Sequence, residues 1–103
     1  FTRCLLGGAK IREAKMDNCG FVQCVLNSAD LFATNLRNSR FSGVHLRNAY
    51  LQDVDFFGAA FYDVDFTGSN LEDAIGLREA TFDAKTKLPK GFELATRKMI
   101  AAP

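Results

Sequence analysis

The chain has 103 residues, the length of one domain, and its 48% hydrophobic and 24% charged residues are typical of a folded globular protein. A net charge of +1 removes any whole-chain argument for binding nucleic acid or an anionic membrane, so we expect no nucleic-acid partner. No apolar run is long enough to form a membrane-spanning helix, and we therefore expect no transmembrane segment.

From the first residue to about residue 76, a large apolar residue recurs at every fifth position. These central residues are Phe1, Leu6, Ile11, Met16, Phe21, Leu26, Leu31, Leu36, Phe41, Leu46, Leu51, Phe56, Phe61, Phe66 and Leu71. A small or β-branched residue stands two positions before each of them from Leu6 onward, and the other positions are mostly polar. A period of five fits neither an α-helix nor a β-strand, because neither would bury the central residues together.

This pattern resembles the pentapeptide-repeat family, whose consensus is A-(D/N)-L-x-x. The units that preserve the consensus best contain Asp30-Leu31, Asn35-Leu36 and Asn70-Leu71. The resemblance implies an all-β fold, a right-handed quadrilateral parallel β-helix, in which each repeat unit forms one side of a square and four units form one coil. Central and small residues then point inward, and the other three positions point outward. A reading of every twentieth residue supports the coil independently, because Phe1, Phe21 and Phe41 fall on one side.

The repeat divides the chain into a β-helix of nearly four coils, residues 1–76, and a C-terminal capping segment, residues 77–103. The register breaks at Gly76, and the small-x-Phe pattern returns one residue late at Phe82, which predicts one more partial side after a one-residue insertion. We expect the capping segment to cover the apolar end of the solenoid.

The end of the capping segment is expected to be helical. Residues 82–92 resemble an ending that is common among pentapeptide-repeat proteins, with Lys90 where an acid is usual. Residues 93–102 are predicted to form a short helix, whose apolar anchors are Leu94, Met99 and Ile100.

The other end of the solenoid has an open edge. Phe1 already stands at a central position, so the first coil would expose strand edges and apolar interior. We expect preceding residues of a longer chain, a protein partner or a second copy of the chain to cover this N-terminal edge.

All three cysteines, Cys4, Cys19 and Cys24, stand at small positions, where a free thiol packs like a small apolar side chain. Cys4 and Cys24 are separated by four repeat units, one full coil, and would stack on neighbouring coils. The expected distance between them allows a disulfide, although side chains on adjacent parallel strands suit the geometry of a disulfide poorly. No CxxC pair occurs and His45 is the single histidine, so no metal site is expected.

Charge is distributed unevenly along the chain. Residues 1–48 hold seven Lys or Arg against three acids, residues 49–84 hold eight acids against Arg78, and residues 85–103 are basic again. This indicates a solvated surface of mixed sign, electrostatic complementarity with a partner or second copy, or DNA mimicry. DNA mimicry is implied by the resemblance, since some members of the family present acidic rods to type II topoisomerases. The acidic part of this chain spans under two coils, which favours a solvated surface or electrostatic complementarity over DNA mimicry.

Several apolar residues fall on outward positions of the repeat and form a candidate interface, because aromatic side chains are enriched in interface cores. They are Leu5, Val22, Val25, Phe32, Tyr50, Phe57 and Tyr62. Leu5 lies at the open N-terminal edge, where a neighbour is expected. For Phe57 and Tyr62 the alternative is that the C-terminal segment covers them.

The sequence contains no recognisable catalytic constellation. There is no G-x-S-x-G, P-loop or G-x-G-x-x-G motif, and His45 is expected to be an exposed surface residue. The spacing of Asp63 and Asp65, and of Asp53 and Asp55, allows their carboxylates to pair, but the repeat favours acids at these positions in any case. We therefore expect no catalytic residues, cofactor or small-molecule substrate.

The sequence predicts a non-enzymatic structural scaffold or protein–protein interaction module, such as a subunit or assembly factor of a larger complex. The alternative is a DNA-mimicking regulator of a type II topoisomerase, gyrase. The C-terminal ending is frequent in cyanobacterial and plastid members of the family. The resemblance therefore implies a chloroplast or thylakoid-associated location, or the bacterial cytoplasm.

Overall fold

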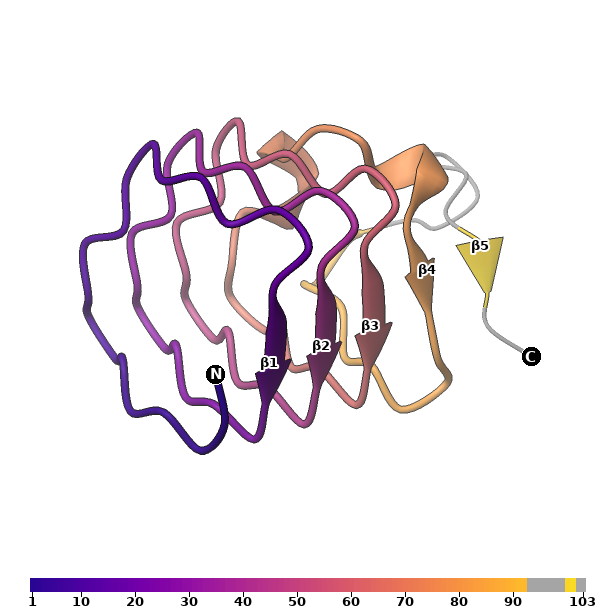
Figure 1. The fold of residues 1–103 in the computed structure, drawn as a ribbon. Helices are drawn as coiled ribbons and strands as arrows, with labels where there is room; N and C mark the ends of the chain where they lie inside the picture. The colour runs from indigo at the N-terminus through magenta and orange to yellow at the C-terminus, as the bar shows by residue number, and fades with distance from the viewer. Residues whose placement is uncertain (93–99, 102–103) are drawn as a thin grey trace.

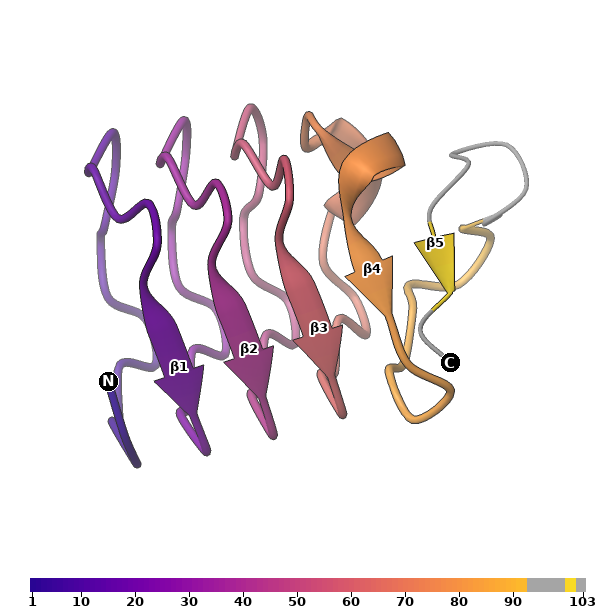
Figure 2. The ribbon, with the colours of Figure 1, turned by 45° about the vertical axis from the view of Figure 1, so that its right-hand side comes forward.

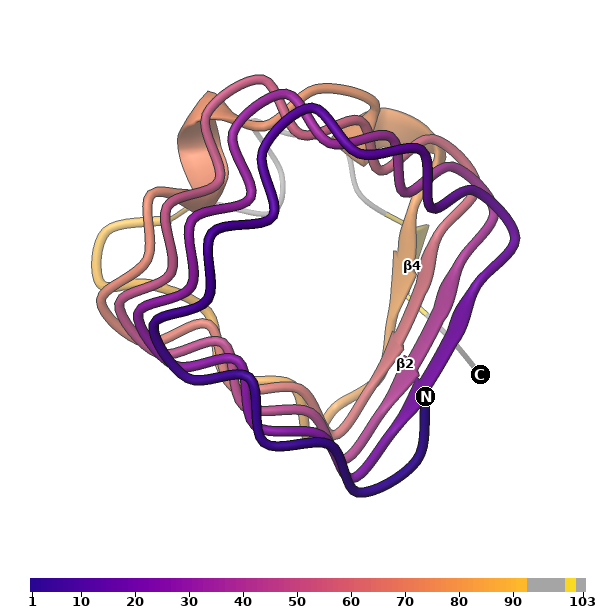
Figure 3. The same ribbon diagram turned by 60° about the vertical axis from the view of Figure 1, so that its left-hand side comes forward.

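The chain folds into the expected right-handed quadrilateral parallel β-helix. The computed structural model describes residues 1–92 and 100–101. Successive coils stack side by side in Figure 1, and Figure 3 shows the coil from its end as a closed loop around the interior. Backbone groups pair between residues one coil apart, as in the bridges Leu5–Val25 and Asp30–Tyr50. Each coil thus satisfies the backbone hydrogen bonds of the next.

The corners between sides depend on a left-handed backbone conformation. From Arg3 through Gly68, every residue two positions after a central residue has a positive φ, for example 54° at Arg3 and 76° at Gly68. Gly, Asn and Asp adopt this conformation at the lowest cost, and they occupy most of the corners. The amide of Asn38, a typical corner, donates to the Phe57 carbonyl at 2.8 Å. A turn-forming residue at this position therefore fixes the square cross-section.

One side of the square carries the regular strands, which form a five-stranded parallel sheet (Figure 2). The strands are β1 (Gly20–Val22), β2 (Arg40–Ser42), β3 (Ala60–Tyr62), β4 (Thr81–Phe82) and β5 (Ile100–Ala101). We call this side A and the following ones B, C and D in chain order. Side B contains central residues Leu6, Leu26, Leu46 and Phe66; side C contains Ile11, Leu31, Leu51 and Leu71; side D contains Met16, Leu36 and Phe56.

The core is a column of central residues packed between small ones. Phe61, with none of its surface exposed, lies with its ring centroid 5.3 Å from Phe41, 5.1 Å from Phe56 and 5.0 Å from Phe66. The last two pairs are edge-to-face, a favourable aromatic geometry. This cluster joins three sides of the square in the later coils.

The first coil is less buried than those that follow. Leu6 and Ile11 are only partly buried, whereas Leu26 and Leu31 at the same positions of the second coil are buried. Phe1 is 56% exposed although it stacks on Phe21 at 5.1 Å. The first coil therefore buries its central residues less completely than the second.

Gly76 is the inserted residue that shifts the register. Ile75 still pairs with Asp55, which stands four repeat units earlier, but Phe82 pairs with Phe61, which stands four units and one further residue earlier. Leu77, which is 4% exposed, takes the central position that Gly76 would have held. The partial side predicted at Phe82 is therefore confirmed.

Two short 3₁₀ helices occur in the last coil, η1 (Leu71–Asp73) and η2 (Leu77–Glu79). The helix predicted for residues 93–102 is wrong at Ile100–Ala101, which form β5 and pair with β4, while residues 93–99 lie outside the described residues. Ile100 and Ala101 pair with the open edge of β4 because this pairing gives hydrogen bonds to backbone groups that would otherwise lack them. Whether the chain is best divided at residue 76 stays a prediction.

The three cysteines are free thiols. The Cys24 thiol donates to the Phe1 carbonyl at 3.4 Å, and the Cys4 amide donates to the Cys24 sulfur at 3.4 Å. Cys24 is fully buried, as expected for a residue standing where other units have Ala.

Ser69 is a buried small residue whose hydroxyl has no hydrogen-bond partner among the described residues. Its neighbours one, two and three coils earlier are all alanine. We expect Ser69→Ala to raise the free energy of unfolding by about 1 kcal/mol, because it removes an unsatisfied polar group. Urea denaturation measures this change.

Ser39 provides the matched control for Ser69. Its hydroxyl donates to the Met16 carbonyl at 3.0 Å and accepts from the Cys19 amide at 3.2 Å. Ser39→Ala should therefore lower the free energy of unfolding by about 1–2 kcal/mol. If both alanine variants were destabilised equally, the assignment of Ser69 as unsatisfied would be wrong.

Candidate interaction surface

The residue just before a central position holds the local backbone with its side chain. Asp30 accepts a hydrogen bond from the Phe32 amide at 3.1 Å, and Asp55 accepts one from the Phe57 amide at 3.0 Å. Asn35 does the same for the Arg37 amide at 3.0 Å. This local turn explains why an acid or amide suits this position of the repeat.

Two of these aspartates also anchor an arginine that covers an exposed ring. On side C, the Arg12 guanidinium lies 3.4 Å from Asp30 and 4.8 Å from the ring centroid of Phe32. On side D, Arg37 lies 3.0 Å from Asp55 and 4.4 Å from the Phe57 ring. Each Arg–Asp–Phe unit combines an ion pair with a cation–π contact, and so restrains an outward aromatic ring.

The seven candidate interface residues do not form one patch, because they lie on all four sides. Leu5 and Val25 stack on side B, Val22 and Tyr62 lie on side A, Phe32 and Tyr50 lie on side C, and Phe57 lies on side D. Their role as an interface stays a prediction.

Side C brings two of the aromatic residues together. The rings of Phe32 and Tyr50 stack with their centroids 6.3 Å apart. Tyr50 remains 41% exposed, and Phe32 is partly buried beneath Arg12. On side B, Leu5 is 83% exposed, but Val25 beside it is partly covered.

The rings of Phe57 and Tyr62 are also in contact with arginine side chains. Arg37 covers the ring of Phe57, which is 39% exposed, and the Arg40 guanidinium lies 5.8 Å from the ring centroid of Tyr62. Arginines of the preceding coil therefore contact both rings, and cover by the C-terminal segment stays a prediction.

Side C is also strongly acidic at one end. Its outward positions in the later coils carry Asp53, Glu72 and Asp73, all exposed, whereas its first coil carries Lys10, Arg12 and Glu13, also exposed. Along this side, the first coil carries both cationic and acidic residues, the aromatic pair lies in the middle, and acids occupy the other end.

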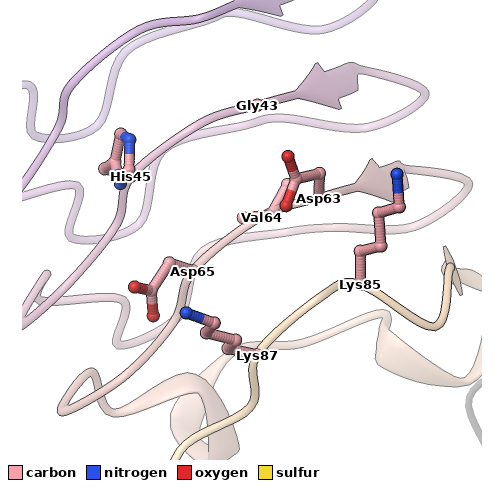
Figure 4. A pocket seen from close by; sticks show the side chains of 7 residues that line it. All are labelled: Gly43, His45, Asp63, Val64, Asp65, Lys85 and Lys87. Carbon is pink, nitrogen blue, oxygen red and sulfur yellow. The ribbon is translucent and has the colours of Figure 1, made fainter.

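A shallow pocket of ≈ 90 Å³ lies where sides A and B meet (Figure 4). It is lined by Gly43, His45, Asp63, Val64, Asp65, Lys85 and Lys87. In Figure 4 the side chains of Asp65 and Lys87 point toward one another, and His45 is exposed as predicted.

Asp65, one of the carboxylates of this pocket, is held in its ionised form. Desolvation opposes ionisation of Asp65, but hydrogen bonds from Thr67 and the charges of Arg47 and Lys87 outweigh it and lower its pKa. A general acid needs a raised pKa, so this carboxylate is not tuned for that role near neutral pH. Within residues 1–92 and 100–101, no group of three or more His, Cys, Asp or Glu is arranged to hold a metal ion.

Comparison with known proteins decides the family. The family model for the pentapeptide repeat region matches residues 1–75. The chain belongs to the pentapeptide-repeat family. A solved pentapeptide repeat protein from Nostoc Pcc 7120 has 29% sequence identity and a TM-score of 0.91, covering 97% of this chain and 82% of that protein. No match to a curated protein was found. The described part has no helix long and apolar enough to cross a membrane.

The turn after β4 in this pentapeptide-repeat protein depends on one carboxylate. Asp83 accepts hydrogen bonds from the Asp63 amide at 3.0 Å, the Thr86 amide at 3.0 Å and the Thr86 hydroxyl at 2.9 Å. Desolvation raises the pKa of Asp83, but these hydrogen bonds and one from the Lys85 amide lower it more. The ionised form is thus the one that the folded state stabilises.

We expect Asp83→Ala to lower the free energy of unfolding by about 1 kcal/mol at neutral pH. Because the folded pKa lies below the unfolded value of about 4, this stabilisation is present above about pH 4 and is lost as pH falls through the folded pKa. Urea denaturation at neutral and acid pH should show the difference between wild type and variant shrinking on acidification.

Asp53→Asn is the control for this linkage. Among the described residues the Asp53 side chain has no hydrogen bond or ion pair, and asparagine suits the left-handed corner, with φ of 60°, as well as aspartate does. Its effect on stability should be small. An Asp83→Ala effect of equal size at both pH values would contradict the assignment.

The Arg–Asp–Phe units were not predicted from the sequence, although their spacing in the sequence indicates them. In each unit the phenylalanine stands one full coil after the arginine, and the aspartate stands two positions before the phenylalanine. Once a coil is known to contain four repeat units, these spacings place the three side chains beside each other on one side.

Proposed function

We propose that this pentapeptide-repeat protein is a non-enzymatic structural scaffold and protein–protein interaction module, acting as a subunit or assembly factor of a larger complex. The observation that supports this is the aromatic pair on side C, Phe32 and Tyr50, stacked and held by Arg12 on a rigid solenoid. Membership of the family supports a structural rather than an enzymatic role.

Preorganised aromatic groups are suited to binding protein surfaces. Aromatic residues and arginine are enriched among the side chains that contribute most to binding. A ring whose position is already fixed loses little conformational entropy when a partner docks. Phe32 is restrained by Arg12, which Asp30 in turn anchors.

Affinity capture with matched variants tests the proposal. The wild-type protein and the variants Tyr50→Ser on side C and Val22→Ser on side A would be used to capture proteins from the source cells. We expect a defined partner that wild type and Val22→Ser retain and Tyr50→Ser loses, with recovery falling about tenfold or more. An identical set of proteins from all three, or no reproducible partner, would contradict the proposal.

The alternative role as a DNA-mimicking gyrase regulator has less support. A DNA mimic needs a nearly continuous negative surface, but the acidic stretch of residues 49–84 spans under two coils and contains Arg78. Loss of gyrase supercoiling on addition of micromolar protein would favour this role, and no effect would exclude it.

The proposal also concerns what covers the N-terminal edge and in which compartment the protein is located. Partly exposed central residues in the first coil support cover of the N-terminal edge by a protein partner or a second copy. The location, either chloroplast and thylakoid-associated or bacterial cytoplasmic, stays a prediction from the C-terminal ending.

A further inference from the structure

We propose that the acidic end of side C binds a basic, arginine-containing segment of a partner protein, with Tyr50 and Glu72 contacting the partner's arginine. The inference rests on the proposed role as an interaction module and names the chemistry of the partner that side C fits. It follows from a contrast between Tyr50 and the other outward aromatic rings of the solenoid.

Three of the four outward aromatic rings in residues 1–76 are contacted by an arginine of the preceding coil. The three rings are Phe32, Phe57 and Tyr62, and the guanidinium lies 4.8, 4.4 and 5.8 Å from their centroids, respectively. Beside Phe32 and Phe57, an aspartate also pairs with the same arginine, at 3.4 and 3.0 Å. On this solenoid, an outward ring with a carboxylate nearby therefore holds a guanidinium at two places.

Tyr50 is the fourth outward ring, and among the described residues no arginine contacts it. The ring stacks on Phe32 with the centroids 6.3 Å apart, and the hydroxyl donates to Oε1 of Gln52 at 2.5 Å. These contacts restrain the side chain, yet 41% of Tyr50 stays exposed. Asp30, one coil earlier, already pairs with Arg12. Tyr50 therefore presents a restrained ring that a cation from outside the chain can contact.

The acids at this end of side C carry charge that the side itself does not compensate. Asp53, Glu72 and Asp73 are exposed on the third and fourth coils, and none of them forms an ion pair with another described residue. Beyond the first coil, no Lys or Arg occupies an outward position of side C. Arg47 lies on side B, where its charge interacts with that of Asp65. A basic segment is therefore the partner that complements this surface.

The arrangement favours arginine over lysine in the partner. Glu72 stands one coil after Gln52 in the same column, and Gln52 holds the hydroxyl of Tyr50, so the carboxylate and the ring lie on neighbouring coils. A planar guanidinium stacks on a ring while it pairs with a carboxylate, whereas the compact ammonium of lysine is only a point charge. Asp53 and Asp73 would contact further basic residues of the same segment.

Fluorescence polarisation with labelled peptides of about ten residues tests this assignment. One peptide alternates arginine with glycine, and the other two carry lysine or glutamate in place of arginine. At low salt the full chain should bind the arginine peptide, should bind the lysine peptide about threefold or more weakly, and should not bind the glutamate peptide. Tyr50→Ser and Glu72→Gln should each weaken binding of the arginine peptide about three- to tenfold.

Two variants are matched controls. Glu13→Gln removes an exposed acid of the same side, but on the first coil beside Lys10 and Arg12. Val22→Ser removes an apolar residue of side A that is 43% exposed. Both should leave binding of the arginine peptide unchanged. Tyr50→Phe keeps the ring and should keep the preference for arginine over lysine, and Glu72→Gln keeps the test valid if Tyr50→Ser folds poorly.

Three results would overturn the inference: no binding of the arginine peptide, equal binding of the arginine and lysine peptides by wild type, or equal losses in Glu13→Gln and Glu72→Gln. A partner captured from the source cells that Tyr50→Ser loses and Glu72→Gln retains, or a captured partner that is a second copy of the chain, would also overturn it while leaving the proposed interaction role intact. Binding of the arginine peptide without any captured partner would support this site and contradict the proposed role.

Discussion

Phe61→Ala is expected to lower the free energy of unfolding by about 3–5 kcal/mol, the range for truncating a buried phenylalanine. The ring has no exposed surface and contacts three other phenylalanine rings, Phe41, Phe56 and Phe66. Its loss leaves a cavity where three sides of the square meet. Because each coil is stabilised by contacts with its nearest neighbours, a cavity at Phe61 weakens the coils on both sides of it. Urea denaturation followed by circular dichroism measures the change.

Two further variants make the Phe61 result interpretable. Phe61→Leu keeps an apolar side chain at the central position and should cost about 1–1.5 kcal/mol, so it is measurable even if the alanine variant does not fold. Phe1→Ala truncates the same side-A column where the ring is 56% exposed, and should cost less than about 1 kcal/mol. Equal effects of Phe61→Ala and Phe1→Ala would contradict the described core.

Gly76→Ala is expected to destabilise the protein by about 2–4 kcal/mol, because two separate penalties add. Gly76 has φ of 77°, in the left-handed region that costs a residue with a Cβ about 1 kcal/mol. An alanine Cβ would also lie 2.5 Å from the Phe57 amide nitrogen and 2.9 Å from its Cα, and backbone atoms cannot move aside as a side chain can.

Gly8→Ala separates these two penalties. Gly8 has φ of 70°, but a Cβ added there would have no heavy atom within 4 Å. Its variant should therefore show only the conformational cost of about 1 kcal/mol. If thermal and urea unfolding gave the same loss for both glycines, close packing of the inserted residue against the previous coil would not be supported.

The repeat was predictable because it depends on local and periodic features. Inward central residues, small partners and turn-forming corners recur in every unit, and each is decided by its immediate chemistry. The insertion at Gly76 was also visible, because Phe82 returns one residue late. That Leu77 would move into the core instead of Gly76 follows from size, since a glycine cannot fill a central position.

Features that depend on long-range pairing were not predictable in the same way. The sequence pattern around Ile100 and Ala101 favours a helix, but pairing with β4 determines the conformation of these two residues. The repeat predicts that the candidate interface residues point outward, but their division among four sides appears only when each residue is assigned to a side of the four-unit coil. The contacts of Arg12 and Arg37 with aromatic rings likewise depend on the coil, because they exist only between neighbouring coils.

The most direct test of the interaction role is site-specific photocrosslinking in the source cells. A photoreactive phenylalanine would replace Gln52, an exposed residue at the centre of side C, and in a separate variant Arg47, an exposed residue of side B. We predict a discrete crosslinked protein from position 52, either a second copy or another chain, and none at matching yield from position 47. Equal labelling from both positions, or none from position 52, would contradict the account of side C as the binding surface.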